Sequence, residues 1–174
     1  REKDRSTAVC NFCDTDFVGV NGPGGGKFIN ALELSDAIES FWPNEESNKY
    51  VVFTGGEPGL QLDKNVVDHL HLKNFEVAVE TNGTLDLPLN IDWLTVSPKA
   101  DSTLKIRRGN ELKLVYPQEN VFPNSFEDLD FEIFYLQPMD NEDKDKNTQR
   151  TIQYCLENPK WKLSLQTHKY MGIA

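Results

Sequence analysis

The chain has 174 residues, of which 38% are hydrophobic, and it carries a formal net charge of −10. This length fits one domain with a substantial core, and the apolar content excludes a disordered chain. The negative charge argues against nucleic acid as a partner, because nucleic-acid-binding proteins present a basic surface to the phosphates. No apolar run in the sequence approaches the ~20 residues that a membrane-spanning helix needs, so no membrane partner is expected.

The three cysteines, Cys10, Cys13 and Cys155, are too few for a disulfide framework. We find no secretory signal in the printed sequence, so a reducing cytoplasmic location is expected. The sequence starts at Arg1, and its opening REKDRSTAV has the polar character of the middle of a loop. We therefore expect one domain, residues 1–174, that is truncated at its N-terminus.

The first half of the chain is predicted to alternate helices with strands. A helix is expected over 35–42, with Ser35 as its N-cap, and a buried strand over 50–54. A second helix is expected over 61–70, because its leucines and valines recur at i, i+4 and i+8. A strand at 75–80 follows it.

The second half is dominated by strands, expected over 93–97, 111–116, 131–137 and 162–166. A last helix is predicted over 147–158, where Cys155 is interpreted as an ordinary core or boundary thiol. Strands that recur with intervening helices favour an α/β fold with a largely parallel sheet. Since the chain is too short for an eight-fold barrel, a partial barrel or an open sheet is expected.

Five of the expected strands stop at a polar or glycine-containing cluster. In parallel α/β folds the carboxyl ends of the strands meet at one edge of the sheet, and ligands bind there. Turns are also polar for purely structural reasons, so a single cluster is weak evidence and the set of five is stronger. The clusters span residues 54–58, 80–83, 97–99, 137–140 and 166–169.

Cys10 and Cys13 form a C-x-x-C pair that several chemistries could use. A four-ligand zinc site needs a second such pair or histidines at a set spacing, and neither pattern is evident. A thioredoxin-type pair stands at the start of a helix, which the following DTDF does not clearly begin. An iron–sulfur cluster with three cysteine ligands would leave one iron open for a ligand. A small zinc-binding module remains the non-enzymatic alternative.

Six motifs carry a more specific signal when they are taken in order: CNFCDTDF, FTGGEP, VETNGT, VSPK, YLQPMD and SLQTHKYMGI. Together they resemble the 7-carboxy-7-deazaguanine synthases, a family of radical S-adenosylmethionine enzymes, over residues 10–173. The resemblance implies a partial (β/α) barrel of the radical S-adenosylmethionine type that lacks its first strand in this chain. It also implies a [4Fe–4S] cluster with Cys10 and Cys13 as two of three ligands, the third lying before Arg1.

The resemblance implies binding roles residue by residue. Thr15 matches a Mg²⁺ ligand, whereas Thr54, His168 and Ala174 match positions that meet the substrate. No residue is assigned a catalytic role beyond binding the cofactors and the substrate. The positions that match contacts to S-adenosylmethionine are Phe12, Asp14, Gly56, Glu57, Ser97, Pro98, Lys99, Gln137, Pro138, Met139 and Asp140.

The implied reaction is a radical ring contraction of 6-carboxy-5,6,7,8-tetrahydropterin to 7-carboxy-7-deazaguanine with loss of ammonia. This carbon–nitrogen lyase step leads to queuosine and other 7-deazapurines. The resemblance further implies an external electron donor and a homodimer. An activase of glycyl-radical enzymes, from the same superfamily, shares the cluster and the GGE motif. It does not explain Thr15, nor a histidine and a chain end that close the pocket.

Overall fold

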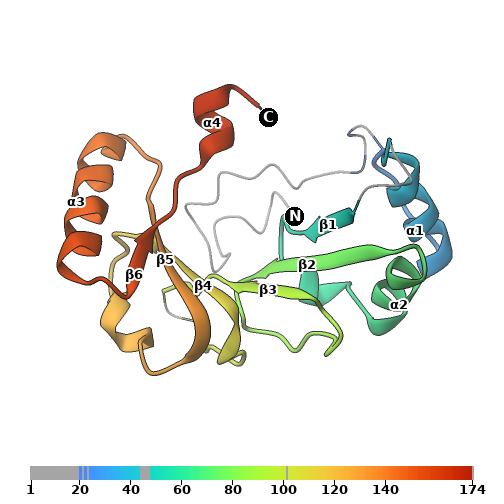
Figure 1. Cartoon of the computed structure of the whole chain (residues 1–174), viewed down its shortest axis with the longest axis horizontal. Coiled ribbons are helices and arrows are strands. Elements are labelled where there is room, and N and C mark those ends of the chain that lie inside the picture. Colours follow the sequence, from blue (N-terminus) through green and yellow to red (C-terminus); the bar gives the residue numbers. More distant parts are fainter. Residues whose placement is uncertain (1–19, 21, 23, 44–47, 101, 174) are drawn as a thin grey trace.

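A six-stranded parallel sheet forms the centre of the computed structural model, which describes residues 20, 22, 24–43, 48–100 and 102–173. The spatial order of the strands equals their order in the chain, and each neighbouring pair is parallel. The sheet bends into a trough whose two ends do not meet, which is the form of a partial barrel (Figure 1). The strands are β1 (Lys49–Phe53), β2 (Phe75–Thr81), β3 (Trp93–Val96), β4 (Arg108–Tyr116), β5 (Asp130–Pro138) and β6 (Trp161–Leu163).

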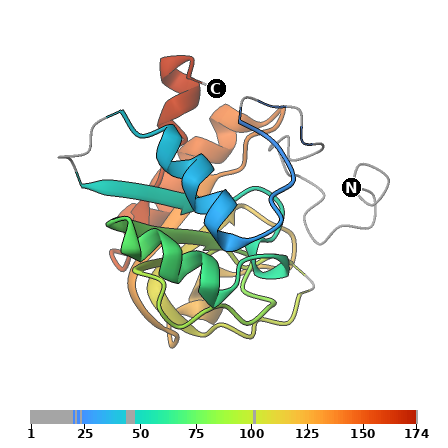
Figure 2. The same cartoon turned by 90° about the vertical axis from the view of Figure 1, so that its right-hand side faces the viewer.

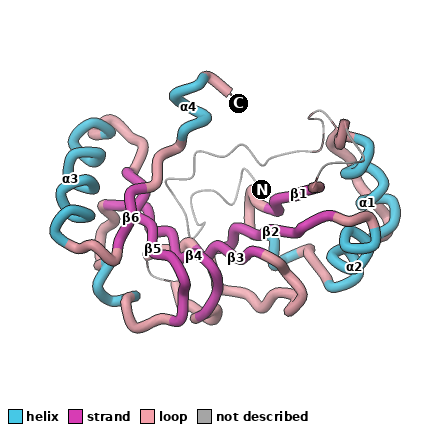
Figure 3. The backbone as a smooth tube through the Cα atoms, viewed as in Figure 1, coloured by secondary structure: helices cyan, strands magenta, loops and turns pink. Residues whose placement is uncertain are grey.

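Helices cover the two ends of this sheet, as the tube in Figure 3 shows. The helices α1 (Ala31–Ser40) and α2 (Lys64–Leu72) lie side by side at the end that carries β1 (Figure 2). Helix α3 (Lys144–Glu157) covers β5 and β6. Two short 3₁₀ helices, η2 (Pro58–Leu60) and η3 (Pro123–Phe126), and the short helix α4 (Thr167–Met171) complete the described elements.

Two hydrophobic clusters hold these layers together. The first joins α2 to β2, and the second lies between the sheet from β3 to β6 and α3. Each fully buried side chain of this size stabilises the fold by about 1.5–3 kcal/mol relative to its exposed state. The first cluster consists of Val66, Val67, Leu70, Phe75 and Val77, and the second of Val96, Leu112, Leu114, Val121, Phe131, Phe134, Leu136 and Trp161.

The predicted start of the first helix was wrong. Ser35 lies buried inside α1, where its hydroxyl donates to the carbonyl of Leu32. Asn30 is the N-cap, since its side chain accepts the N–H of Glu33 at 2.9 Å. Glu33 in turn accepts the N–H of Ile29 at 3.0 Å, an arrangement similar to a capping box. The capping residue is therefore Asn30, five residues before the Ser35 that the prediction chose, and the first turn of α1 precedes the apolar residues on which the prediction was based.

The predicted last strand, 162–166, was too long. Strand β6 ends at Leu163, and residues 167–171 form the short helix α4. His168 therefore lies on a helix beyond the strand rather than at the strand end. The alternation in KLSLQ fits a strand, but β6 pairs only with β5, and that pairing stops where Leu136 meets Leu163.

Gly83, directly after β2, provides a test of the close packing at this point. Its φ is +76°, and an added Cβ would lie 2.6 Å from Leu104 Cδ1 and 2.7 Å from Val96 Cγ1. We expect Gly83→Ala to lower the free energy of unfolding by roughly 2–4 kcal/mol, because left-handed backbone and overpacking both oppose it. Urea denaturation measures this loss.

Gly172→Ala is the matched control, because Gly172 has a φ of +66° but no atom within 4 Å of the added Cβ. We expect Gly172→Ala to lower the free energy of unfolding only by the cost of a left-handed backbone, about 1–2 kcal/mol. A Gly83→Ala loss no larger than the Gly172→Ala loss would show that crowding by Leu104 and Val96 is unimportant.

Candidate active site

The five polar clusters do meet at one edge of the sheet. They follow β1, β2, β3, β5 and β6, and these strands run parallel in one sheet, so their carboxyl ends lie at the same edge. The predicted placement of the strand ends at one edge is therefore confirmed, whereas a single site shared by the five clusters remains a prediction. The ligand that each residue binds remains a prediction.

Glu57 ties the ends of β1 and β2 together. Its Oε1 accepts the hydroxyl of Thr81 at 2.7 Å and the N–H of Gly59 at 2.9 Å, and its Oε2 accepts the N–H of Asn82 at 2.9 Å. A carboxylate has about four acceptor positions, so these three donors leave capacity for one more. Glu57 therefore keeps one acceptor position for a further hydrogen-bond donor, such as an ammonium group.

The turn between β1 and Glu57 depends on glycine. Gly55 has a φ of +100°, a conformation that favours glycine over residues with a side chain. Gly56 is exposed, so its backbone is accessible to a ligand. Thr54, also exposed, has its hydroxyl 3.5 Å from Glu80 Oε2, which places it beside the sheet face described below.

The cluster after β3 is fixed by its own hydrogen bonds. The N–H of Ser97 donates to the carbonyl of Thr81 at 2.8 Å, which continues the β2–β3 ladder. The ammonium of Lys99 donates to the carbonyl of Ser97 at 2.8 Å and to its hydroxyl at 2.6 Å. Pro98 between them is buried. The Ser97 hydroxyl and the Lys99 charge are thus held together at the edge.

A buried asparagine organises the cluster after β5. Gln137 and Pro138 end the strand, and the N–H of Met139 donates to the carbonyl of Tyr116 at 2.8 Å. The side-chain amide of Asn147 on α3 donates to the carbonyl of Met139 at 3.0 Å. Asn147 was missed in the sequence because a polar residue inside a helix gives no signal of its burial.

Asp140 completes this cluster and carries two ion pairs. It accepts a hydrogen bond from Lys169 on α4, and its Oδ1 lies 3.3 Å from the Nζ of Lys144. The hydrogen bond from Lys169 lowers the pKa of Asp140, although partial burial opposes this shift. The carboxylate is therefore ionised and bound to two lysines.

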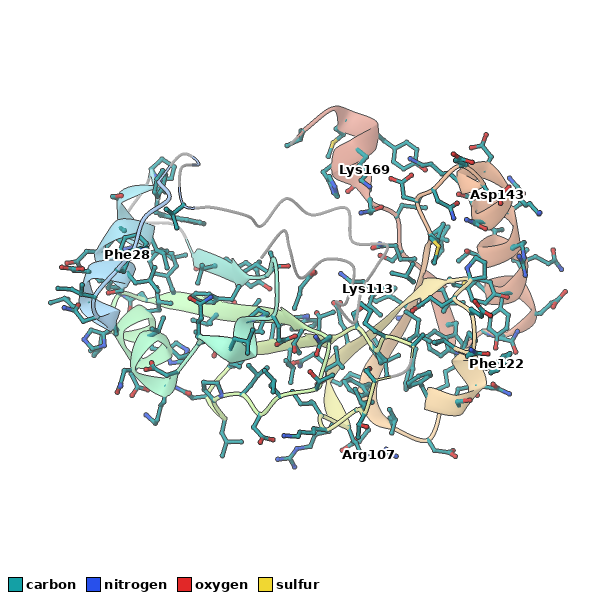
Figure 4. The ribbon with its side chains drawn as sticks, turned by 180° about the vertical axis from the view of Figure 1, so that it is seen from behind. Phe28, Arg107, Lys113, Phe122, Asp143 and Lys169 are labelled. Carbon is teal, nitrogen blue, oxygen red and sulfur yellow. The ribbon has the colours of Figure 1, made fainter. Side chains whose placement is uncertain are left out.

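The sheet presents a polar face opposite the side chains of its hydrophobic clusters. Glu80 accepts the Nζ of Lys113 at 2.8 Å, and Glu111 accepts Trp93 Nε1 at 3.1 Å and the Thr95 hydroxyl at 3.2 Å. We call these five residues the polar sheet face. Figure 4 shows Lys113 near the middle of the molecule, whereas Arg107 lies at its rim.

Sequence reasoning assigned no ligand role to the polar sheet face, although a signal was present. In the segment ELKLVY, Glu111 and Lys113 alternate with Leu112 and Leu114, and this period of two separates the faces of a strand. Partial burial and the nearby carboxylates, among them Glu111, raise the pKa of Tyr50 on β1.

The remaining predicted site residues are distributed as follows. His168 is exposed on α4. Cys155 is half-buried on α3 against the second hydrophobic cluster, and burial raises the pKa of its thiol. Its position against that cluster confirms Cys155 as a boundary thiol. The predicted sites that lie outside the described residues are Cys10, Phe12, Cys13, Asp14, Thr15 and Ala174.

The described part of the chain has neither a metal-binding cluster of side chains nor a helix that could span a membrane. No group of three or more histidine, cysteine, aspartate or glutamate side chains there is arranged to hold a metal ion. Within the same residues, every helix is too short or too polar to cross a bilayer.

Thr81 tests whether the Glu57 bridge stabilises the edge. Its buried hydroxyl donates to Glu57 and accepts the N–H of Gly83 at 3.0 Å. Thr81→Val keeps the shape but leaves that N–H without a partner, so we expect a loss of about 1–3 kcal/mol in the free energy of unfolding. Thr103→Val, at an exposed threonine, is the control and should change stability by less than about 0.5 kcal/mol. Equal effects of the two substitutions in urea denaturation would contradict the role of the bridge.

Comparisons with known proteins show what this chain is similar to. No family model matches the chain. The chain is 55% identical over 173 residues to the 7-carboxy-7-deazaguanine synthase of Caulobacter vibrioides, covering 99% of this chain and 82% of the relative. The enzymes of that name from Bordetella pertussis and Bradyrhizobium diazoefficiens are 54% and 55% identical, with the same coverage.

A solved structure shows the same fold. The crystal structure of QueE from Escherichia coli matches with a TM-score of 0.58 and 24% identity, over 78% of this chain and 63% of that one. At this identity the match concerns the fold alone, and it agrees with the partial barrel described above.

Proposed function

Since the chain belongs to the 7-carboxy-7-deazaguanine synthase family, we propose that it contracts the ring of 6-carboxy-5,6,7,8-tetrahydropterin to 7-carboxy-7-deazaguanine with loss of ammonia. The enzyme is then a carbon–nitrogen lyase of 7-deazapurine and queuosine biosynthesis. The observation that carries this proposal is the 55% identity over 99% of the chain to a protein of that name.

The proposed cofactors are a [4Fe–4S] cluster, with Cys10 and Cys13 among its ligands, and S-adenosylmethionine. Together they supply the one-electron chemistry that removes a hydrogen atom from the pterin. The protein's part is to bind the two molecules next to each other and to exclude water. The edge of the sheet suits this task because it gathers fixed polar groups from five strand ends.

Different described residues are proposed to bind different parts of S-adenosylmethionine. Glu57, already fixed by three hydrogen bonds, accepts the ammonium of the methionine part, and Gly56 offers its bare backbone beside it. Ser97 and Lys99 meet the ribose and adenine side, and the 137–140 segment adds contacts there. Because these groups are fixed before the ligand arrives, little ordering accompanies binding.

Mg²⁺ is the third proposed cofactor, with Thr15 as a protein ligand. A hydroxyl oxygen suits this hard cation, which prefers oxygen ligands and retains several waters. The ion would also bind the carboxylate of the pterin and so orient it, a template role. Thr54, His168 and Ala174 are proposed to contact the same substrate.

Three further features belong to the proposal and rest on the family alone. An external electron donor starts the reaction, the protein works as a homodimer, and it resides in the cytoplasm, where cluster-ligating thiols stay reduced. The two alternatives raised by the sequence, a glycyl-radical activase and a zinc-binding module, lose support. Neither accounts for identity of 55% over nearly the whole chain to a 7-carboxy-7-deazaguanine synthase.

The direct test is anaerobic turnover by the reconstituted holoenzyme. With S-adenosylmethionine, reductant and 6-carboxy-5,6,7,8-tetrahydropterin, we expect 7-carboxy-7-deazaguanine and 5′-deoxyadenosine, both identified by mass spectrometry. Cys13→Ser should abolish both products, because it removes a cluster ligand. Release of 5′-deoxyadenosine without ring-contracted product would show a radical enzyme with another substrate and would overturn the proposal.

Thr15→Ala tests the metal site. It removes a hydroxyl ligand, so we expect about a tenfold or greater rise in the Mg²⁺ concentration that gives half-maximal turnover, with unchanged iron content. Thr15→Ser retains the hydroxyl and serves as the control. An unchanged Mg²⁺ dependence in Thr15→Ala would show that Thr15 is not a ligand.

A further inference from the structure

Helix α4 has little apolar contact to hold it in place. None of its described residues, nor those that follow up to 173, is buried. The side chains of Tyr170, Met171 and Ile173 are 62%, 65% and 57% exposed. A helix of five residues is not stable by itself in water, so its position must come from contacts with the rest of the protein.

Asp140 supplies such contacts from the neighbouring strand end. It follows β5, and α4 follows β6, which pairs with β5 in parallel, so the two meet at the carboxyl edge. Lys169 of α4 donates to Asp140, and Lys144 at the start of α3 lies 3.3 Å from the same carboxylate. The side chains of Asp140 and Lys169 are 25% and 28% exposed, so water screens this pair less than it screens a surface pair.

A second contact also connects the start of α3 to α4. The Nζ of Lys144 lies 5.2 Å from the centre of the Tyr170 ring, within the range of a cation–π interaction. Lys144 therefore touches both Asp140 and α4. The narrow pocket between them is lined by Pro138, Thr148, Leu165 and Gln166 as well. Figure 4 shows Lys169 on α4 facing the region where α3 begins.

We propose that Asp140 is a positioning residue, which uses Lys169 and Lys144 to hold α4 and its His168 at the substrate-binding edge. The statement that His168 binds the pterin rests on the proposed function, whereas the statement that Asp140 holds α4 in place does not. Asp140 then contributes to pterin binding indirectly, because it fixes the position of α4. A direct contact between Asp140 and S-adenosylmethionine would be a second, independent role. The family resemblance gave Asp140 only that second role.

Hydrogen exchange of the full chain tests the holding of α4 without any turnover. The relevant amides are those of Lys169 and Ile173, which donate to the carbonyls of Gln166 and His168. We expect Asp140→Asn to raise their exchange rate about fivefold and Lys144→Met about twofold, in line with partly exposed ion pairs. Wild-type protein in 1 M KCl should exchange faster than at low salt but more slowly than Asp140→Asn, because salt screens these partly buried pairs only in part.

Two matched controls lie at the start of α3, Asp143 as its N-cap residue and Lys146 in its first turn. Asp143 is exposed and makes no side-chain cap, and Lys146 is also exposed. Asp143→Asn and Lys146→Met change the net charge in the same way, and we expect them to leave α4 exchange unchanged. If Asp140→Asn unfolds the chain, as faster exchange in β2 and β5 would show, Lys144→Met decides the outcome.

Steady-state kinetics of the holoenzyme then connect the position of α4 to the substrate. Asp140→Asn, Lys144→Met and His168→Ala should each raise the KM for the pterin about threefold or more, with a smaller change in the KM for S-adenosylmethionine. Unchanged α4 exchange in a folded Asp140→Asn protein would overturn the proposal. A rise only in the KM for S-adenosylmethionine would do so as well. Faster α4 exchange in a protein that fails to contract the pterin would support the positioning role and would reject only the assigned substrate.

Discussion

Parallel pairing from β1 to β6 determines where every polar group of the edge lies. Neighbouring strands are joined by hydrogen bonds in fixed register, so the residues that follow each strand are brought within a few strand widths of one another. The Glu57 bridge strengthens this arrangement at β1 and β2, beyond their last paired residues Phe53 and Val79. The polar edge is thus a consequence of strand direction, and its chemistry comes from a few residues after each strand.

The hydrophobic core and the polar sheet face lie on opposite faces of the same strands. The two hydrophobic clusters pack one face of the sheet against α2 and α3, while the polar sheet face carries Glu80, Glu111 and Lys113. Alternation along a strand allows both, because successive side chains point to opposite faces. Charged residues on that face are stabilised in pairs or by several donors, so the sheet tolerates them without loss of its core.

Polar contacts at the edge differ in how firmly they hold their elements. Glu57 accepts the hydroxyl of Thr81 in β2, the N–H of Asn82 directly after that strand and the N–H of Gly59 in η2, so its position follows that of the end of β2. Asp140 instead binds the flexible side chains of Lys144 and Lys169, and α4 adds little apolar contact. Such a contact is sensitive to salt and to a single substitution. The edge therefore combines a rigid part near β1 to β3 with a more adjustable part near β6.

The sequence by itself determined the α/β class, most strand positions and the placement of the five clusters at one edge, because apolar periodicity and strand-end chemistry are local patterns. It also pointed to the family through six short motifs in order. Only the tertiary structure decided which groups contact each other: Glu57 with Thr81, Lys113 with Glu80, Asn147 with Met139, and Asp140 with α4. The end of β6 at Leu163 was also decided there, whereas the helix cap at Asn30 is a local pattern that the sequence prediction overlooked. Those contacts and the end of β6 depend on long-range pairing and burial, which spacing along a chain does not encode.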